Sequence, residues 1–316
     1  MTKPVFGCAS LAGALWQNTR ALNLIEARLI HDTGGTWVRY FCLWHLLEPS
    51  RGQYDPKAVA SIINAVSSAE AFGLKIVVCV SGPAPIWAQA PGDLHSNGSP
   101  PANAADYGNI LRALAAYFGS RVAAWELWNE PNIPKYLFPV NVTKYVSMLK
   151  AGFNAVKQVS PESLVLSGGL SSDRSGIVDA VFIDQMYQQG AGGYLDGVCL
   201  HPYTFPYSVL SDPYARANVV PHTNQVMAAH GDGAKKIWIT EYGQPTGKSL
   251  LAVSETKQSD ILIEYLTVGS TLPYLGPLFL FTTRDFATDP LDVDGNMGIF
   301  RYNWSPKPVV ARLKGL

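Results

Sequence analysis

The stretch "LKIVVCVSG" at residues 74–82 indicates the kind of sheet that this chain forms. Its apolar residues follow one another, without the alternation expected of a strand that has one face in water. β-Branched valine and isoleucine dominate the run, and a glycine ends it. Such a run is typical of a strand in a parallel sheet whose two faces are both covered by helices.

Similar runs recur along the chain. They cover residues 4–10, 37–44, 123–132, 163–169, 197–203, 236–243 and 276–285. Helical patterns with apolar residues at i, i+3 and i+4 lie between several of them. They cover residues 55–73, 103–120, 142–161 and 254–270, and a short last helix is expected at 305–316. This alternation predicts an α/β fold, the (β/α)8 TIM barrel.

The length of the chain fits one such barrel. It has 316 residues, and a barrel of this kind needs roughly 250 residues plus insertions. We find no linker and no change in composition, so we expect one domain over residues 1–316. Because the chain ends with the last helix, we expect no accessory β-sandwich.

Composition excludes several classes of function. Lys and Arg together number 24, as do Asp and Glu, so nothing predicts a nucleic-acid partner. No apolar run approaches the roughly 18 residues that a membrane helix needs. The start "MTKPVFGCAS" lacks the features of a secretory signal. We therefore expect a cytoplasmic protein unless a leader was removed. The oligomeric state is not determined by these features.

Two acidic motifs follow at the ends of predicted strands. "WELWNEPN" (125–132) ends the fourth run with Glu130, and "WITEYG" (238–243) ends the seventh with Glu241. The chemistry of TIM barrels lies at the carboxyl ends of their strands, so we expect both side chains at one mouth. Cleavage of a glycosidic bond needs such a pair, one carboxyl protonated and the other ionised. The alternative is that each glutamate caps a helix or pairs with an arginine.

These motifs resemble the paired motifs of clan A retaining glycoside hydrolases, and most closely those of family 39-like enzymes. "WVRYFCLWHLLEPSRGQYD" (37–55) and "GIFRYNWSPKPVV" (298–310) also follow that pattern, so the resemblance covers essentially the whole barrel. It implies a glycosidase in which Glu241 is the nucleophile and Glu130 the general acid/base. The substrate would be an oligosaccharide or a polysaccharide.

The resemblance also implies roles for four neighbouring residues. Asn129 would hydrogen-bond the 2-hydroxyl of the sugar, and Arg39 would keep the nucleophile ionised. His201 and Tyr203 would line the same site, with the Tyr203 hydroxyl donating to Glu241.

Other residues are weaker candidates for contact with the sugar. Aromatic side chains at the strand ends suit the C–H faces of sugar rings, and they are Trp16, Trp44, Trp87 and Trp128. His45 follows Trp44, and the long segment 81–104 with His95 is a candidate binding loop. The last strand reads "LFLFTTRDF" (278–286), where the clan commonly has a tryptophan. Phe281 could replace that platform. Arg284 could reach the mouth and favour an acidic or heavily hydroxylated sugar. Alternatively, it could pair with Asp285 or with the backbone.

Glu126 precedes Glu130 by four residues and lies deeper in the same strand. We expect a buried, hydrogen-bonded carboxylate, and the alternative is direct support of the site. We expect no metal and no cofactor, because no cluster of ligands such as H-E-x-x-H occurs. "DPLDVDGN" (289–296) lacks the glutamate of a calcium loop, so a tight turn is expected there.

Two alternatives to hydrolysis remain open at this stage. One is a transglycosylase that uses the same residues, and the other is a catalytically silent barrel that binds carbohydrate. The sequence determines neither the sugar and its linkage nor whether the enzyme acts inside a chain or at its end.

Overall fold

The computed structural model describes residues 3–10, 19–93 and 96–316. Within these residues, eight parallel strands form a closed barrel in the order in which they follow along the chain. The strands are β1 (Phe6–Ser10), β2 (Trp37–Leu43), β3 (Lys75–Ser81), β4 (Ala124–Asn129), β5 (Leu164–Ser171), β6 (Gly197–His201), β7 (Lys236–Tyr242) and β8 (Leu275–Phe281). The predicted (β/α)8 barrel is therefore confirmed.

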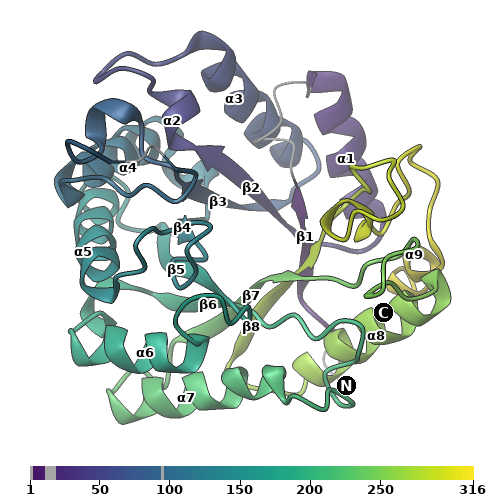
Figure 1. Ribbon diagram of the computed structural model, residues 1–316. Helices are drawn as coiled ribbons and strands as arrows, with labels where there is room; N and C mark the ends of the chain where they lie inside the picture. The colour runs from purple at the N-terminus through teal and green to yellow at the C-terminus, as the bar shows by residue number, and fades with distance from the viewer. Residues whose placement is uncertain (1–2, 11–18, 94–95) are drawn as a thin grey trace.

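Helices surround this barrel on the outside (Figure 1). They are α1 (Arg20–Asp32), α2 (Trp44–Leu47), α3 (Pro56–Glu70), α4 (Ala104–Phe118), α5 (Val142–Val159), α6 (Asp179–Gln188), α7 (Val219–Ala229), α8 (Glu255–Gly269) and α9 (Pro308–Leu313). No helix in the described part of the chain is long and apolar enough to cross a membrane.

Local sequence signals set the ends of these helices. The side chain of Asp55 accepts hydrogen bonds from the backbone N–H groups of Lys57 and Ala58, and Pro56 is the first residue of α3. A carboxylate at this position satisfies N–H groups that have no partner within the helix, and proline has no N–H to leave unpaired. The chain leaves α3 through Gly73 at a φ of +67°, a value that glycine adopts without strain.

The amino-terminal end of the barrel interior is filled by apolar side chains. The indole of Trp37 meets that of Trp238 edge to face at 5.1 Å, and the Phe279 ring stacks on Trp238 at 6.4 Å. The smaller side chains of Val77, Ala124, Leu166 and Cys199 complete this cluster, which we call the barrel floor. The site described below lies above this floor, toward the carboxyl ends of the strands.

Candidate active site

Arg39 occupies the centre of the barrel interior above the floor. Its Nε donates to Glu126 Oε2 at 2.5 Å, and its Nη1 donates to Glu241 Oε1 at 2.8 Å. Nη2 donates to Glu126 Oε1 and to Asn129 Oδ1, both at 3.0 Å. Arg39 is completely buried. Burial alone would lower its pKa, but the surrounding charges, that of Glu126 foremost, raise it, so the guanidinium stays charged.

Glu126 is the buried carboxylate that its depth in the strand predicted. Besides both Arg39 contacts, its Oε1 accepts hydrogen bonds from the Gly169 amide at 3.0 Å and the Thr240 hydroxyl at 3.2 Å. Through these contacts it fixes the position of Arg39, which in turn binds Glu241. Glu126 is thus the buried, hydrogen-bonded carboxylate that was expected, and it acts on the site through Arg39.

The backbone of β4 is irregular where the strand ends. Trp128 has a φ of +78° and Glu130 a φ of +42°, values that side-chain-bearing residues rarely adopt. In a regular strand successive side chains point to opposite faces. Here Asn129 bonds to Arg39 inside the barrel, and the adjacent Glu130 bonds to His201. The unusual backbone therefore brings two neighbouring side chains to one site. Strained backbone of this kind concentrates at functional sites.

Glu241 is held from two directions. Arg39 approaches one carboxylate oxygen, and the Tyr203 hydroxyl donates to the other, Oε2, at 2.8 Å. Burial, followed by the charges of Glu241 and Glu130, raises the pKa of Tyr203 well above its usual value. The phenol therefore remains a donor over the whole physiological range of pH.

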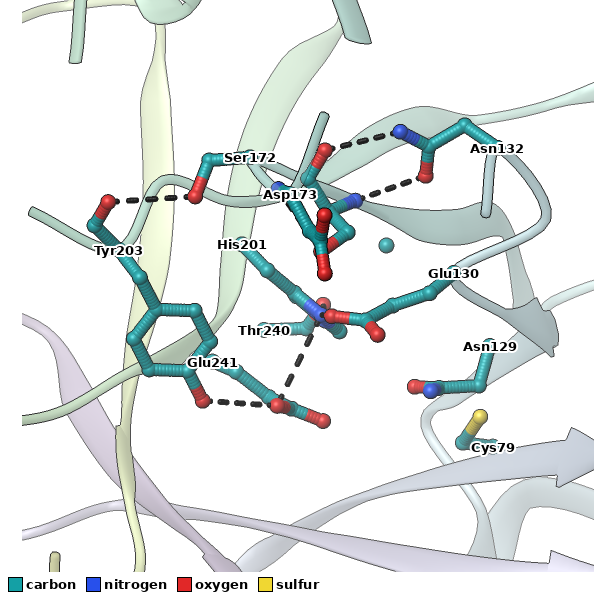
Figure 2. Close-up of polar contacts among 12 residues, drawn as sticks. Cys79, Asn129, Glu130, Asn132, Ser172, Asp173, His201, Tyr203, Thr240 and Glu241 are labelled. Carbon is teal, nitrogen blue, oxygen red and sulfur yellow. Dashed lines mark hydrogen bonds and ion pairs between the residues drawn. The ribbon is translucent and has the colours of Figure 1, made fainter. Parts of the chain in front are cut away.

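Glu130 belongs to a chain of polar contacts that runs into the barrel (Figure 2). Its Oε1 lies 3.0 Å from His201 Nδ1, and His201 Nε2 lies 3.0 Å from Thr240 Oγ1. Thr240 donates its proton to Glu126, so it must accept from His201 Nε2. Burial would lower the pKa of His201, but the Glu241 charge and the hydrogen bond to Glu130 raise it.

The two strand-end glutamates face each other across one cleft. One carboxylate oxygen of each lies within 4.8 Å of the other and of a His201 ring nitrogen. The cleft has a volume of about 590 Å³, within the range of ligand pockets. It is lined by Phe41, Glu130, Ile133, Lys135, Tyr136, Ser171, Ser172, Asp173, Tyr203, Phe205, Arg216, Glu241, Phe281, Phe286, Asp294 and Met297.

Glu130, His201 and Glu241 could each offer one atom to a metal ion. The Arg39 guanidinium opposes this, because it already lies 2.8 Å from Glu241. Tyr203 points a proton at the second oxygen of the same carboxylate. This set of partners is suited to an anion-stabilising site and is a poor cage for a cation.

The expectation that Trp44 and Trp128 line the cleft is wrong. Both are fully buried, and the rings of Trp87, Trp44, Tyr107 and Trp128 form a continuous series 5.5–5.8 Å apart outside the barrel. The Trp128 indole donates to the Tyr136 carbonyl at 2.7 Å. The irregular backbone turns Trp128 away from the mouth, so these aromatic residues support the loops and not the cleft.

The remaining weak candidates divide between the cleft and its surroundings. Phe281 lines the cleft, on the strand where the clan commonly has a tryptophan. Trp87, His45 and Arg284 do not. The Trp87 ring packs under the Arg51 guanidinium, whose Cζ lies 4.4 Å from the ring centroid. His45 is half-buried, and this burial lowers its pKa. Arg284 Nη1 donates to the Tyr302 carbonyl at 3.1 Å, which is the pairing with backbone considered for it, and its guanidinium lies over the rings of Tyr302 and Trp304.

The long segment after β3 also has a supporting role in its described part. The Gly98 carbonyl accepts from the Phe138 amide at 2.8 Å, and Lys144 donates to the carbonyls of Pro101 and Ala102. The described residues of the segment thus brace the loop after β4, and none of them lines the cleft. Trp16 and His95 lie outside the described residues.

Several residues that line the cleft carried no recognisable signal in the sequence. Lys135, Asp173 and Asp294 lie in loops after three different strands. Phe41 points into the barrel mouth two residues after Arg39, so strand parity could have identified it. The "DPLDVDGN" segment forms the expected turn, in which Asp292 accepts from the Gly295 amide at 2.8 Å, and the turn brings Asp294 to the cleft.

Several solved structures that are similar to this chain are glycosidases. A family 39 glycoside hydrolase from Bacteroides cellulosilyticus WH2 is 24% identical with a TM-score of 0.81; the match covers 99% of this chain and 63% of that one. An exo-β-1,4-mannosidase from Opitutaceae bacterium strain TAV5 is 17% identical with a TM-score of 0.73, covering 99% and 58%. GH5_18 from Streptomyces cattleya, in complex with GlcNAc, is 16% identical with a TM-score of 0.75, covering 99% and 79%.

At these identities the likeness shows the fold alone. The chain spans less than two thirds of the first two of these structures. A search of curated protein sequences gave no match. The family comparison is more specific, because the sequence pattern described as cellulase (glycosyl hydrolase family 5) matches residues 6–271. The resemblance to clan A is thereby confirmed, and the chain belongs to the cellulase family, glycosyl hydrolase family 5.

Proposed function

We propose that this protein is a retaining glycoside hydrolase, with residues 1–316 as one catalytic domain. The observation that carries the proposal is that one carboxylate oxygen of Glu130 lies within 4.8 Å of one carboxylate oxygen of Glu241 across one cleft. Retaining enzymes have carboxyl groups about 5–5.5 Å apart, whereas inverting enzymes leave roughly 6.5–9.5 Å for a water molecule.

Glu241 is the nucleophile in this proposal. Arg39 donates to one of its carboxylate oxygens and Tyr203 to the other, and these contacts fix the carboxylate at the cleft. A carboxylate oxygen attacks the anomeric carbon while the bond from that carbon to the leaving oxygen breaks. The electron pair of that bond goes to the leaving oxygen, and a glycosyl ester of Glu241 forms.

Glu130 supplies the proton that the leaving oxygen takes up. His201 Nε2 donates to Thr240, so in the neutral ring Nδ1 is an acceptor for a protonated Glu130. In the charged ring Nδ1 donates to an ionised Glu130. Either way one proton lies between these two groups, beside the leaving oxygen. In the second step Glu130 takes a proton from water, whose oxygen attacks the anomeric carbon and releases Glu241.

The walls of the cleft suit a sugar. Phe41, Tyr203, Phe205, Phe281 and Phe286 present ring surfaces that pack against sugar C–H groups. Asn129 lies beside Glu130, where the resemblance assigns it to the 2-hydroxyl. The substrate of this proposal is therefore an oligosaccharide or a polysaccharide.

The test begins with a panel of 4-nitrophenyl β-glycosides. Glucosides, mannosides and xylosides come first, because related structures are named as a β-mannosidase, a β-xylosidase and a glucosidase. Incubation with the matching 2,4-dinitrophenyl 2-deoxy-2-fluoroglycoside should attach one sugar to the peptide that contains Glu241, as seen by mass spectrometry. Glu241→Gln should lower kcat at least about 10⁴-fold.

Glu130→Ala provides the complementary experiment. It should slow hydrolysis most for substrates with poor leaving groups. With an activated aryl glycoside, whose first step needs no acid, azide should restore the rate by attacking the glycosyl ester of Glu241 and yielding a glycosyl azide. Glu162→Gln, at an exposed position, is the matched control. Full activity of Glu241→Gln would overturn the proposal, and saccharide binding without turnover would indicate the silent barrel. Products lengthened by an added acceptor sugar would indicate transglycosylation.

A further inference from the structure

A lysine is buried behind one wall of the catalytic cleft. Lys307 immediately precedes α9, and its side chain is almost completely buried. Its Nζ donates to Asp285 Oδ1 at 2.8 Å, to Thr246 Oγ1 at 2.9 Å and to the Asn296 carbonyl at 3.3 Å. An ammonium group has three protons to donate, so all three are used within the protein. Lys307 has no role in the chemistry described so far.

Stability alone does not explain the buried pair of Lys307 and Asp285. Burial lowers the pKa of Lys307, and the contacts with Asp285 oppose this only in part. Burial likewise raises the pKa of Asp285. Both groups therefore lose hydration that their contact does not fully replace. Apolar side chains of similar volume often stabilise a buried position as well as an ion pair does or better, so the question becomes what this lysine holds in place.

The partners of Lys307 join the loops that follow β7 and β8. Thr246 lies in the loop after β7, and Asn296 lies in the loop after β8. The Asn296 carbonyl accepts from the Thr246 amide at 3.0 Å and from the Thr246 hydroxyl at 2.9 Å. Because that hydroxyl donates to Asn296, it accepts from Lys307. The ammonium group therefore fixes the backbone of Asn296 both directly and through Thr246.

Asn296 lies between two residues of the cleft wall, Asp294 and Met297. On the other side of Met297, the Gly298 amide donates to Asp285 Oδ1 at 2.8 Å, and this is the oxygen that accepts from the lysine. The backbone before and after Met297 is thus tied to the buried ion pair.

The turn that precedes Asn296 is closed by the side chain of Asn296 itself. Its amide donates to the Asp289 carbonyl at 2.7 Å and to the Asp292 carbonyl at 2.6 Å. Within the described ranges of the chain, no group donates a hydrogen bond to the carboxylate of Asp294. The place of Asp294 at the cleft therefore depends on the backbone of this turn, which Asn296 anchors.

We propose that Lys307 is a positioning residue for the reaction, whose buried ammonium group fixes Asn296 and thereby places Asp294 and Met297 at the wall of the cleft. This rests on the proposed function and goes beyond it, because the double displacement itself uses none of these four residues. A displaced wall holds the substrate away from the reacting carboxylates, and a misplacement of about 1 Å can lower a rate about 10²-fold.

The experiment is a double-mutant cycle on kcat/KM, measured with the aryl glycoside that the panel identifies. Lys307→Met removes the charge and should lower kcat/KM about tenfold to hundredfold. Asp294→Ala should lower it about threefold to tenfold. With alanine already at position 294, Lys307→Met should have an effect at least about threefold smaller, because the side chain that the lysine places is gone. A lysine that only stabilises the fold would have the same effect on kcat/KM in both backgrounds.

Thr246→Val tests the same link in a protein that keeps the buried ion pair and therefore folds more readily than Lys307→Met. It removes only the hydroxyl between Lys307 and Asn296, so it should lower kcat/KM about threefold to tenfold. Hydrogen exchange followed by mass spectrometry adds a readout that needs no substrate. The peptide that contains Met297 and Gly298 should exchange at least about tenfold faster in Lys307→Met than in the wild type.

Two control variants match these changes. Lys314→Met removes an exposed lysine at the end of α9. Thr267→Val removes a hydroxyl in α8 that donates to the Ile263 carbonyl. Both should keep the wild-type kcat/KM and the wild-type exchange of the same peptide.

The outcomes separate this proposal from the proposed function. Wild-type kcat/KM in folded Lys307→Met and Thr246→Val would overturn the positioning role, and so would an effect of Lys307→Met that does not change when Asp294 is replaced. Unchanged exchange in Lys307→Met would overturn the link from the lysine to the wall. A wild-type enzyme without turnover and without labelling at Glu241 would instead overturn the proposed function, and the exchange measurement would still decide whether the lysine holds the turn.

Discussion

The barrel floor and the charged layer above it are built by the same strands with opposite chemistry. Trp37, Trp238 and Phe279 close the amino-terminal end. Two residues further along the same three strands come Arg39, Thr240 and Phe281. Arg39 and its partners Glu126 and Glu241 form what we call the charged layer. Strand parity points both layers into the barrel, so the backbone geometry does not distinguish them.

The difference between the two layers lies in the cost of burial. Each large apolar side chain of the floor stabilises the fold by roughly 1.5–3 kcal/mol on burial. The charges of Arg39, Glu126 and Glu241 lose their hydration there, and their mutual contacts only compensate for that loss. The floor therefore stabilises the barrel, and the charged layer is retained for another reason, which we propose is catalysis.

Removing the central cation should have the largest effect. Arg39→Met leaves Glu126 and Glu241 without their shared partner, so kcat/KM on the active aryl glycoside should fall at least about 10³-fold. The free energy of unfolding in urea should fall by about 3–5 kcal/mol, because two buried carboxylates lose their counter-charge.

The control for this variant is Arg121→Met. Arg121 pairs with Glu70 at 2.7 Å on the surface, and its loss should cost less than about 1 kcal/mol. Wild-type kcat/KM in Arg39→Met would contradict the view that the charged layer serves the reaction.

A cavity in the floor should separate stability from activity. Trp238→Ala removes a 5% exposed indole and should lower the free energy of unfolding by about 3–5 kcal/mol. Below its melting temperature the folded variant should keep kcat/KM within about twofold, because the floor touches no reacting group. Tyr117→Ala, at a 59% exposed position, should change stability by less than about 1 kcal/mol. A large loss of kcat/KM in folded Trp238→Ala would show that the two layers are coupled.

The contribution of His201 should depend on pH. Its pKa is raised in the folded state, so its protonation stabilises the fold fully below the unfolded value near 6.5. That contribution is lost as the pH rises through the folded value. The difference in unfolding free energy between wild type and His201→Asn should thus be larger at about pH 5.5 than at about pH 8.5. The corresponding difference for Trp238→Ala should stay constant, and a constant difference for His201→Asn would contradict the assignment.

The smallest effects are expected from the aromatic residues outside the mouth. Trp87→Leu should leave kcat and KM within about twofold and cost about 1 kcal/mol of stability, from its contacts to Arg51 and the Glu48 carbonyl. Phe281→Ala, inside the cleft, should lower kcat/KM about tenfold. Equal effects of the two substitutions on kcat/KM would contradict the assignment of Phe281 to the cleft and of Trp87 to the support of the loops.

Much of the fold could be predicted because its signals are local. The apolar run of β3 and the Asp55–Pro56 start of α3 each reflect forces that act over a few residues. Glu130 and Glu241 could be placed at the ends of β4 and β7 because the apolar runs that precede them are also local signals. The orientation of Trp128 was not predictable, because it depends on a left-handed backbone and on Gly82, where an added Cβ would lie 2.2 Å from the indole.

The sequence by itself determined that this chain forms a barrel and that two glutamates end strands of it. Hydrophobic patterning and strand length are properties of short segments, so they can be read in order along the chain. Only the tertiary structure decided how far apart Glu130 and Glu241 lie and which aromatic side chains enter the cleft. Those features arise from residues that are far apart in sequence and meet only when the barrel closes.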